Sequence, residues 1–263
     1  MQRGVHGIFL RLMNIPLNPP LLKGTTQTLF QNHKQSKYSK MSLFRVDPNH
    51  PFEGPHQPIP AAEYGAPLTR AKAAMIMVHG RGATAQSMFS LADEFAQPDF
   101  HFRAPQAQNH TWYPYSFMQP KEKNQTGLSS GLQRIHDLLE EIRSAGIPSE
   151  KVILLGFSQG ACLATEFAAR HPRKLGGVVG FSGGLIGPEI DPTLYSGSMD
   201  KTPVFLGCSN IDPHIPKERV DETEAVFEVL NADVTKTIYP GMPHTVNEDE
   251  IKTVRGMMAY LLR

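Results

Sequence analysis

The feature that most constrains the fold is the stretch VILLGFSQGACL, residues 152–163. Four apolar residues lead into Gly-Phe-Ser-Gln-Gly and a run of small residues, a pattern typical of a buried strand that turns sharply into a helix. A serine at such a turn needs glycine neighbours, because the backbone is strained there and the flanking elements pack closely. Chance alone places Gly-x-Ser-x-Gly in a chain of this length roughly one time in ten. The setting between strand and helix is therefore what makes Ser158 a candidate nucleophile.

Short apolar runs alternate with helical periodicities from about residue 57 onward. This alternation predicts an α/β fold with a mostly parallel central sheet flanked by helices, and without a large lid domain. The predicted strands span residues 73–78, 100–103, 151–155, 177–181, 203–207 and 233–239. The predicted helices span residues 85–96, 128–142, 159–170 and 218–230, and a capping box at 247–250 opens a last helix.

The first 46 residues differ in composition from the rest, because they contain no Asp or Glu but seven Lys or Arg residues. We interpret residues 1–46 as a basic, disordered N-terminal extension. A basic tail, or an upstream start codon with Met41 as the true start, is the favoured explanation, and an organellar transit peptide is the alternative. The folded domain is expected over residues 47–263.

Composition limits the classes of partner. The 263 residues are 40% hydrophobic and 19% charged, which is typical of a soluble globular protein, and the net charge of +1 gives no reason to expect nucleic acid. No segment is long and apolar enough for a secretory signal or a membrane span, so we expect no integral membrane association. Cys162 and Cys208 lie in contexts typical of buried free thiols, which favours a reducing, cytoplasmic location. The sequence does not indicate an oligomeric state.

A serine nucleophile needs a base, and the base needs an orienting acid. In a sheet of this kind the chain order is serine, acid, histidine, with acid and base on loops after the last strands. His244 follows the last predicted strand and is the expected base, and Asp212, on the loop after the preceding strand, is the expected acid. His171 ends the helix that follows the serine. His214, beside the acid, is either a substrate contact or a surface loop residue.

A tetrahedral oxyanion needs preorganised backbone donors. We expect one from the N–H of Gln159, directly after the serine, and one from the loop HGRG at 79–82, with Arg81 as the donor. The Arg81 side chain is expected at the surface or in an ion pair, with a substrate carboxylate as the alternative. No metal and no other cofactor is expected, because the histidines show no ligand spacing and the glycines match no phosphate loop or dinucleotide fingerprint.

Aromatic residues between 109 and 117 are candidates for the walls of a substrate pocket, since aromatic side chains supply much of the contact area in such sites. The candidates are Trp112, Tyr113 and Phe117, and a place in the core is the equal alternative for each. The long connection over 182–202 either folds over the site as a partial cap or lies on the surface. A cap of that size favours short or medium acyl groups.

Together, five segments resemble the phospholipase/carboxylesterase branch of the α/β-hydrolases, which includes the acyl-protein thioesterases. They are HGRG at 79–82, WYP at 112–114, GFSQGA at 156–161, DPHIP at 212–216 and GMPH at 241–244. The resemblance runs from about residue 73 to the C-terminus. It implies an α/β-hydrolase catalytic domain with Ser158, Asp212 and His244 as the triad, and with Arg81 and Gln159 as oxyanion donors.

The sequence departs from the thioesterase members of that family. They usually carry a bulky apolar residue in place of Arg81 and a small residue in place of Pro243, and the WYP segment looks more like that of bacterial esterases. We therefore expect a serine carboxylic-ester hydrolase that cleaves small or medium acyl esters through an acyl-enzyme. A lysophospholipase or acyl-protein thioesterase is the alternative within the same chemistry, and a non-catalytic binding scaffold is the alternative outside it.

Overall fold

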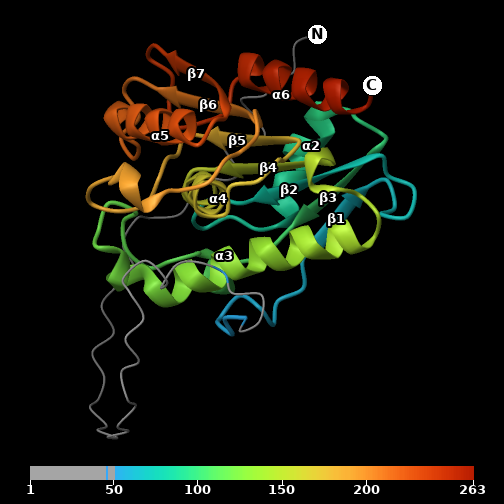
Figure 1. Ribbon diagram of the computed structural model, residues 1–263, viewed down its shortest axis with the longest axis horizontal. Helices are drawn as coiled ribbons and strands as arrows, with labels where there is room; N and C mark the ends of the chain where they lie inside the picture. The colour runs from blue at the N-terminus through green and yellow to red at the C-terminus, as the bar shows by residue number, and fades with distance from the viewer. Residues whose placement is uncertain (1–45, 47–50) are drawn as a thin grey trace, which may run out of the picture.

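The protein is described by a computed structural model that covers Val46 and residues 51–263. Its centre is a seven-stranded sheet with the strand order β1-β3-β2-β4-β5-β6-β7 (Figure 1). The edge strand β1 pairs antiparallel with β3, and every other pair in the sheet is parallel. The strands are β1 (Ala62–Gly65), β2 (Ala73–Val78), β3 (Phe100–Ala104), β4 (Val152–Phe157), β5 (Gly177–Phe181), β6 (Pro203–Ser209) and β7 (Asp233–Tyr239).

Helices cover both faces of the sheet. Figure 1 shows α3 along one side of the sheet and α6 on the other. The α-helices are α2 (Phe89–Phe95), α3 (Lys121–Ser144), α4 (Gln159–Arg170), α5 (Lys217–Val229) and α6 (Glu248–Leu261). Short 3-10 helices lie at η3 (Gln86–Met88), η4 (Gln108–His110), η5 (Ser149–Lys151) and η6 (Pro192–Leu194).

The central strand β2 shows how the two cores form. Its six residues are all buried, and alternate side chains point to opposite faces. Ala74, Ile76 and Val78 join the core beneath α3, α4 and α5, whereas Ala73, Met75 and Met77 join the core beneath α2 and α6. A strand that is apolar at every position is thus buried on both sides, as parallel sheets require.

The predicted fold class is confirmed, and four elements match their predicted bounds: residues 73–78, 159–170, 177–181 and 233–239. Three predictions were incomplete. The edge strand β1 was not predicted, because it has four residues, three of them exposed. The helix expected over 85–96 divides into η3 and α2. Helix α2 ends at Phe95, because the next residue, Ala96, has a left-handed φ of 50°. Helix α3 begins at Lys121, seven residues before its first predicted apolar position.

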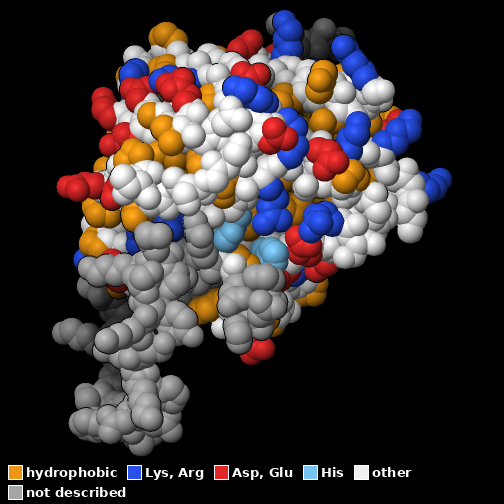
Figure 2. Space-filling view, in the orientation of Figure 1, with side chains coloured by type: hydrophobic (Ala, Val, Ile, Leu, Met, Phe, Trp, Pro, Cys, Tyr) orange, Lys and Arg blue, Asp and Glu red, His pale blue; other side chains and the backbone are white. Residues whose placement is uncertain are grey.

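The predicted N-terminal extension lies almost wholly outside the described residues. Of that segment the structure describes Val46, which donates its N–H to Nε2 of His171 at 3.3 Å. The domain division at residue 46 therefore stays a prediction. Among the described helices, none combines the length and the apolar character needed to cross a membrane. Acidic and basic side chains are interspersed over the face in Figure 2, in keeping with the small net charge.

Candidate active site

Ser158 lies at the turn between β4 and α4, on the edge of the sheet where the parallel strands end. Its φ of 54° and ψ of −121° are far from the regions that residues with a Cβ usually adopt. The turn is held from both sides, since the Ser158 N–H donates to the carbonyl of Phe181 at 2.9 Å and its carbonyl accepts from Cys162 at 3.0 Å. Strained backbone of this kind persists where surrounding structure fixes it, and it is common at functional sites.

The two glycines of the Gly-x-Ser-x-Gly motif are required by close packing. A Cβ on Gly160 would lie 2.1 Å from the carbonyl oxygen of Val78, and a Cβ on Gly156 would lie 2.3 Å from that of Gly160. Both positions therefore exclude any side chain, because helix α4 starts directly against strands β2 and β4.

The structure brings Ser158, His244 and Asp212 together in one hydrogen-bonded line. Nε2 of His244 lies 2.9 Å from Oγ of Ser158, and Nδ1 of His244 lies 2.6 Å from Oδ2 of Asp212. Because an ionised carboxylate only accepts, Nδ1 carries the proton and Nε2 is left to accept from the serine hydroxyl. This arrangement suits a serine, its base and an orienting acid.

Asp212 is held as a carboxylate by its surroundings. Burial works to raise its pKa, but hydrogen bonds from the His244 ring and from the backbone N–H groups of His214 and Ile215 outweigh burial and lower the pKa overall. Those two N–H groups lie 2.8 and 3.1 Å from Oδ1. The carboxylate side chain has no exposed surface, so its negative charge is directed at His244.

Two rings flank the imidazole of His244. The ring of Phe157 lies 5.0 Å from it, centroid to centroid, and the ring of His214 lies 4.9 Å from it in an edge-to-face arrangement. Burial and the neighbouring His244 lower the pKa of His214. His214 is thus an exposed loop residue that also contacts the candidate base.

The loop after β2 is shaped by His79, a buried residue for which no role was predicted. Its Nδ1 donates to the carbonyl of Gly80 at 2.8 Å, and its Nε2 accepts the N–H of Ala107 at 3.1 Å. Burial lowers the pKa of His79 to about 4, so the ring is neutral at physiological pH. Within the described residues, the backbone N–H groups of Arg81 and Gln159 donate no hydrogen bond and are free to serve a ligand.

The side chains of Arg81 and Gln159 bind backbone groups of the loop over 111–115. Arg81 donates to three carbonyls, those of Tyr113, Pro114 and Tyr115, at 2.9 to 3.1 Å. Gln159 accepts the N–H of Trp112 at 2.9 Å and donates to the carbonyl of Tyr113 at 2.8 Å. Arg81 is exposed, as expected, but among the described residues no carboxylate forms a salt bridge with it, and its guanidinium binds backbone carbonyls instead.

Of the three aromatic residues predicted to wall a pocket, two present almost no surface. Trp112 is 0% exposed and Tyr113 is 2% exposed, and both belong to the core beneath α3 and α4. The indole N–H of Trp112 donates to the carbonyl of His79 at 2.8 Å. Both rings thus take the place in the core that was the equal alternative, because their large apolar area is used in packing. Their contact with a substrate stays a prediction.

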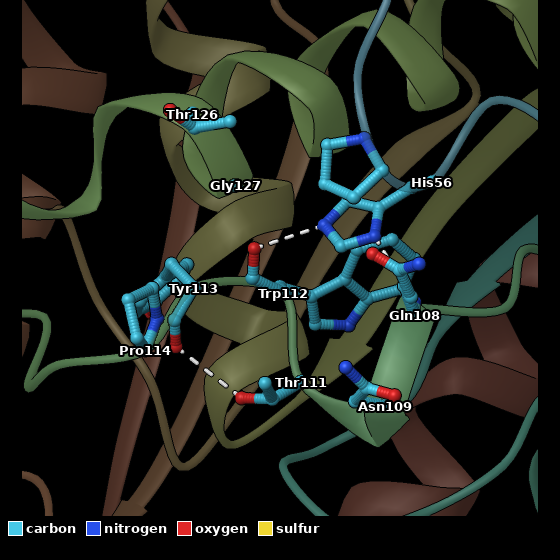
Figure 3. Close-up of a pocket in the computed structure, with 10 residues that line it drawn as sticks. His56, Gln108, Asn109, Thr111, Trp112, Tyr113, Pro114, Thr126 and Gly127 are labelled. Atoms are coloured by element: carbon cyan, nitrogen blue, oxygen red, sulfur yellow. Dashed lines mark hydrogen bonds between the residues drawn. The ribbon is translucent and has the colours of Figure 1, made fainter. Parts of the chain in front are cut away.

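The third aromatic residue, Phe117, is 8% exposed and lies 5.5 Å beneath the guanidinium of Arg219. A hollow of about 220 Å³ is lined by residues that include Trp112, Tyr113 and His56 (Figure 3). Ser158 is not among the residues that line it, so this hollow is separate from the hydrogen-bonded line.

The connection over 182–202 is neither a cap nor a surface loop along its whole length. Residues 182–187 are buried, and the segment is fixed by Glu166, which accepts the N–H of Ile186 at 2.9 Å, and by Arg219, which donates to the carbonyls of Leu185 and Gly187 at 2.8 Å. Most residues of the segment beyond residue 187 are exposed. Residues 182–187 therefore form a fixed wall beside α4.

Neither cysteine forms part of the hydrogen-bonded line, although Sγ of Cys208 lies 4.0 Å from Oδ2 of Asp212. Cys162 and Cys208 are free, buried thiols, and burial raises their pKa values to about 11 and about 12. Over the described part of the chain, no group of three or more His, Cys, Asp or Glu side chains is arranged to hold a metal ion.

Comparisons with known proteins agree with this architecture. A phospholipase/carboxylesterase crystal structure from Dyadobacter fermentans is 42% identical, with a TM-score of 0.75 over 81% of this chain and 100% of that one. Acyl-protein thioesterase 1 of Debaryomyces hansenii is 28% identical and covers 79% of this chain and 99% of its own. The Bacillus cereus carboxylesterase, at 16% identity and a TM-score of 0.63 over 77% of this chain and 94% of its own, shares the fold. The family model described as Phospholipase/Carboxylesterase matches residues 61–262, and the chain belongs to this family of α/β-hydrolases.

Proposed function

We propose that the protein is a serine carboxylic-ester hydrolase in which Ser158, His244 and Asp212 form the catalytic triad. The observation that carries the proposal is the continuous hydrogen-bonded line, 2.9 Å from Ser158 to His244 and 2.6 Å from His244 to Asp212. The serine occupies a strained turn that presents its oxygen at the ends of the parallel strands. Geometry of this kind is what defines a triad across unrelated folds.

In the first half-reaction, Oγ of Ser158 attacks the carbonyl carbon of the ester while Nε2 of His244 takes the hydroxyl proton. Asp212 stabilises the imidazolium that results. The tetrahedral intermediate collapses, the C–O bond to the alcohol breaks, and His244 gives its proton to the departing alkoxide. In the second half-reaction water, deprotonated by His244, attacks the acyl-enzyme, and the acid is released with Ser158 regenerated.

The negative charge on the substrate oxygen is stabilised by the backbone N–H groups of Arg81 and Gln159. The Gln159 N–H is the first of helix α4, where the helix dipole adds positive potential. No step of this mechanism needs a metal or an organic cofactor, and the partner it implies is a small-molecule ester. The two buried free thiols fit the reducing cytoplasm, which is the location we propose.

Small or medium acyl esters are the substrates we propose. One feature supports this choice over a long-chain lipid or an acylated protein: the buried wall over 182–187 leaves the connection little freedom to open around a long chain. The 42% identical relative is a phospholipase/carboxylesterase.

A second candidate function is acyl-protein thioesterase activity, which is favoured by the relatives of that name, 28% identical over 230 residues in one case. The chemistry would be identical, because a thioester is attacked by the same serine. The two functions differ in the acyl chain and the leaving group.

The test is hydrolysis of p-nitrophenyl esters from acetate to palmitate, with an acyl thioester series alongside, by wild type and Ser158→Ala. We expect rates that peak at short or medium chains and fall by about 10³-fold or more in the variant. Ser144→Ala, at the exposed end of α3, is the matched control and should keep wild-type activity. A peak at long-chain thioesters would favour the second candidate function, and equal rates for wild type and Ser158→Ala would refute the proposed triad.

A further inference from the structure

The carbonyl oxygen of Tyr113 is a shared acceptor. It receives hydrogen bonds from Nη2 of Arg81 at 2.9 Å, from Nε2 of Gln159 at 2.8 Å and from the Thr111 hydroxyl at 3.2 Å. Figure 3 shows the last of these bonds, with the Tyr113 carbonyl directed toward Thr111. A backbone carbonyl has two lone pairs, so three donors on one oxygen is an unusually crowded arrangement.

Two of these donors belong to the residues whose backbone N–H groups we assign to the oxyanion. Arg81 comes from the loop after β2, and Gln159 comes from the start of α4. Along the chain they are far apart, and no hydrogen bond joins these two residues directly. The Tyr113 carbonyl therefore links the two halves of the proposed oxyanion site.

The loop that carries this carbonyl is itself rigidly held. The N–H of Tyr115 donates to Oδ1 of Asn124 at 2.9 Å, and Nδ2 of Asn124 donates to the carbonyl of Ser116 at 3.0 Å. Helix α3 approaches so closely that a Cβ on Gly127 would lie 2.2 Å from the carbonyl of Trp112. The link is thus anchored to α3 and does not move freely with Arg81 or Gln159.

The guanidinium of Arg81 can bind the loop over 111–115 at several points. It reaches three successive carbonyls at once, as a planar group with five N–H donors can. Because its partners are carbonyls, and no carboxylate among the described residues forms a salt bridge with it, its charge strengthens these bonds without being neutralised. A lysine would offer a single nitrogen at that place.

We propose that the Arg81 side chain is a positioning residue that fixes the separation of the two oxyanion donors by way of the Tyr113 carbonyl. The inference rests on the proposed function, since it concerns the same serine and the same oxyanion. Its physical basis is that oxyanion donors work through preorganisation, so a displacement of about 1 Å costs about two orders of magnitude in rate. The side chain acts through backbone groups and does not touch substrate.

The test uses Arg81→Ala and Arg81→Lys in the full chain, each of which keeps the backbone N–H at position 81. For Arg81→Ala we expect kcat to fall by about 10- to 100-fold with KM within about twofold of wild type. Affinity for a trifluoromethyl ketone, which forms an oxyanion with the serine, should fall by the same factor as kcat/KM. Arg81→Lys should retain an intermediate rate.

Added guanidinium ion supplies a readout that general destabilisation would not produce. At millimolar concentrations it should restore part of the kcat of Arg81→Ala and leave wild type and the surface control Arg143→Ala unchanged. Arg143 is exposed on α3 and pairs with Glu140. If Arg81→Ala fails to fold, the same comparison of kcat, KM and ketone affinity is made on Arg81→Lys.

The outcomes separate this inference from the proposed function. If Ser158→Ala abolishes hydrolysis while both Arg81 variants keep wild-type kcat and ketone affinity, the positioning role is refuted and the triad stands. If Ser158→Ala keeps the full rate, the proposed function itself fails. A fall in kcat of the Arg81 variants without a matching loss of ketone affinity would also overturn the positioning role.

Discussion

Asp212 and His244 are joined by the shortest hydrogen bond of the candidate site, with 2.6 Å between Oδ2 and Nδ1. The other carboxylate oxygen accepts two backbone N–H groups, so the acid cannot rotate away from the ring. The bond fixes the proton on Nδ1 and leaves Nε2 to face Ser158. One carboxylate therefore sets both the tautomer and the orientation of the proposed base.

Asp212→Asn should keep the shape of the site and lower kcat by about 10³- to 10⁴-fold, because the amide favours the wrong tautomer of His244. Steady-state hydrolysis of a short p-nitrophenyl ester measures the effect. Asp200→Asn is a matched control, since Asp200 is exposed with a φ of 48°, a conformation that Asn tolerates well. A loss of less than about tenfold in Asp212→Asn would argue against Asp212 as the acid.

Gly160→Ala should destabilise the protein by about 3 kcal/mol, because its Cβ would lie 2.1 Å from the Val78 carbonyl, a backbone atom that cannot give way. Urea unfolding monitored by circular dichroism gives the free energy of unfolding. Gly256→Ala on α6, where nothing lies within 4 Å of the new Cβ, should instead stabilise by about 0.5–1 kcal/mol. Equal stability of the two variants would contradict the close packing of α4 on β2.

The lowered pKa of His79 predicts that the protein loses stability at acid pH. Its pKa in the folded protein is about 4, below the ordinary 6.5, so between these values the unfolded chain binds a proton that the folded chain does not. The stabilisation is present above pH 6.5 and is lost at about 1.4 kcal/mol per pH unit as the pH falls toward 4. His79→Gln should be less stable at pH 7 but lose less between pH 7 and 5. An unchanged slope would exclude His79 as the source.

The raised pKa of Glu250 predicts instead that stability falls as the pH rises. Burial raises its pKa to about 8, so stability is greatest below the ordinary value of 4.5 and falls as the pH rises toward 8. Glu250→Gln should therefore raise the free energy of unfolding at pH 8 by at least about 1 kcal/mol, while the amide oxygen keeps the capping bond to Asn247. Glu248→Gln, on the exposed first turn of α6, is the control and should show no such gain. A variant that is less stable than wild type at pH 8 would contradict this account.

The parallel sheet and the place of Ser158 could be predicted because each depends on a local sequence pattern. Strand β2 is apolar at all six positions, and α4 is bounded by the glycine turn before it and by its own periodicity. The capping box at Asn247 was equally local, and the structure confirms both of its hydrogen bonds. His244 and Asp212 were predicted from chain order, and in the structure His244 is hydrogen-bonded to both Ser158 and Asp212.

The roles of the side chains around the site could not be predicted, because they depend on contacts between distant segments. Arg81 and Tyr113 are 32 residues apart, and Gln159 and Trp112 are 47 apart. No periodicity reports such a contact, so the sequence predicted an exposed Arg81 but not its three carbonyl partners. For Trp112 and Tyr113 a pocket wall and the core were equal alternatives, because aromatic composition does not distinguish a ring that faces a ligand from one that faces the core.

The most direct test of the central claim is covalent labelling with a fluorophosphonate, followed by mass spectrometry of the tryptic peptides. The account predicts one adduct per chain, on Ser158, that forms at a rate lowered by His244→Ala and does not form in Ser158→Ala. An adduct on another residue, or an undiminished adduct in Ser158→Ala, would contradict the assignment of Ser158 as the nucleophile.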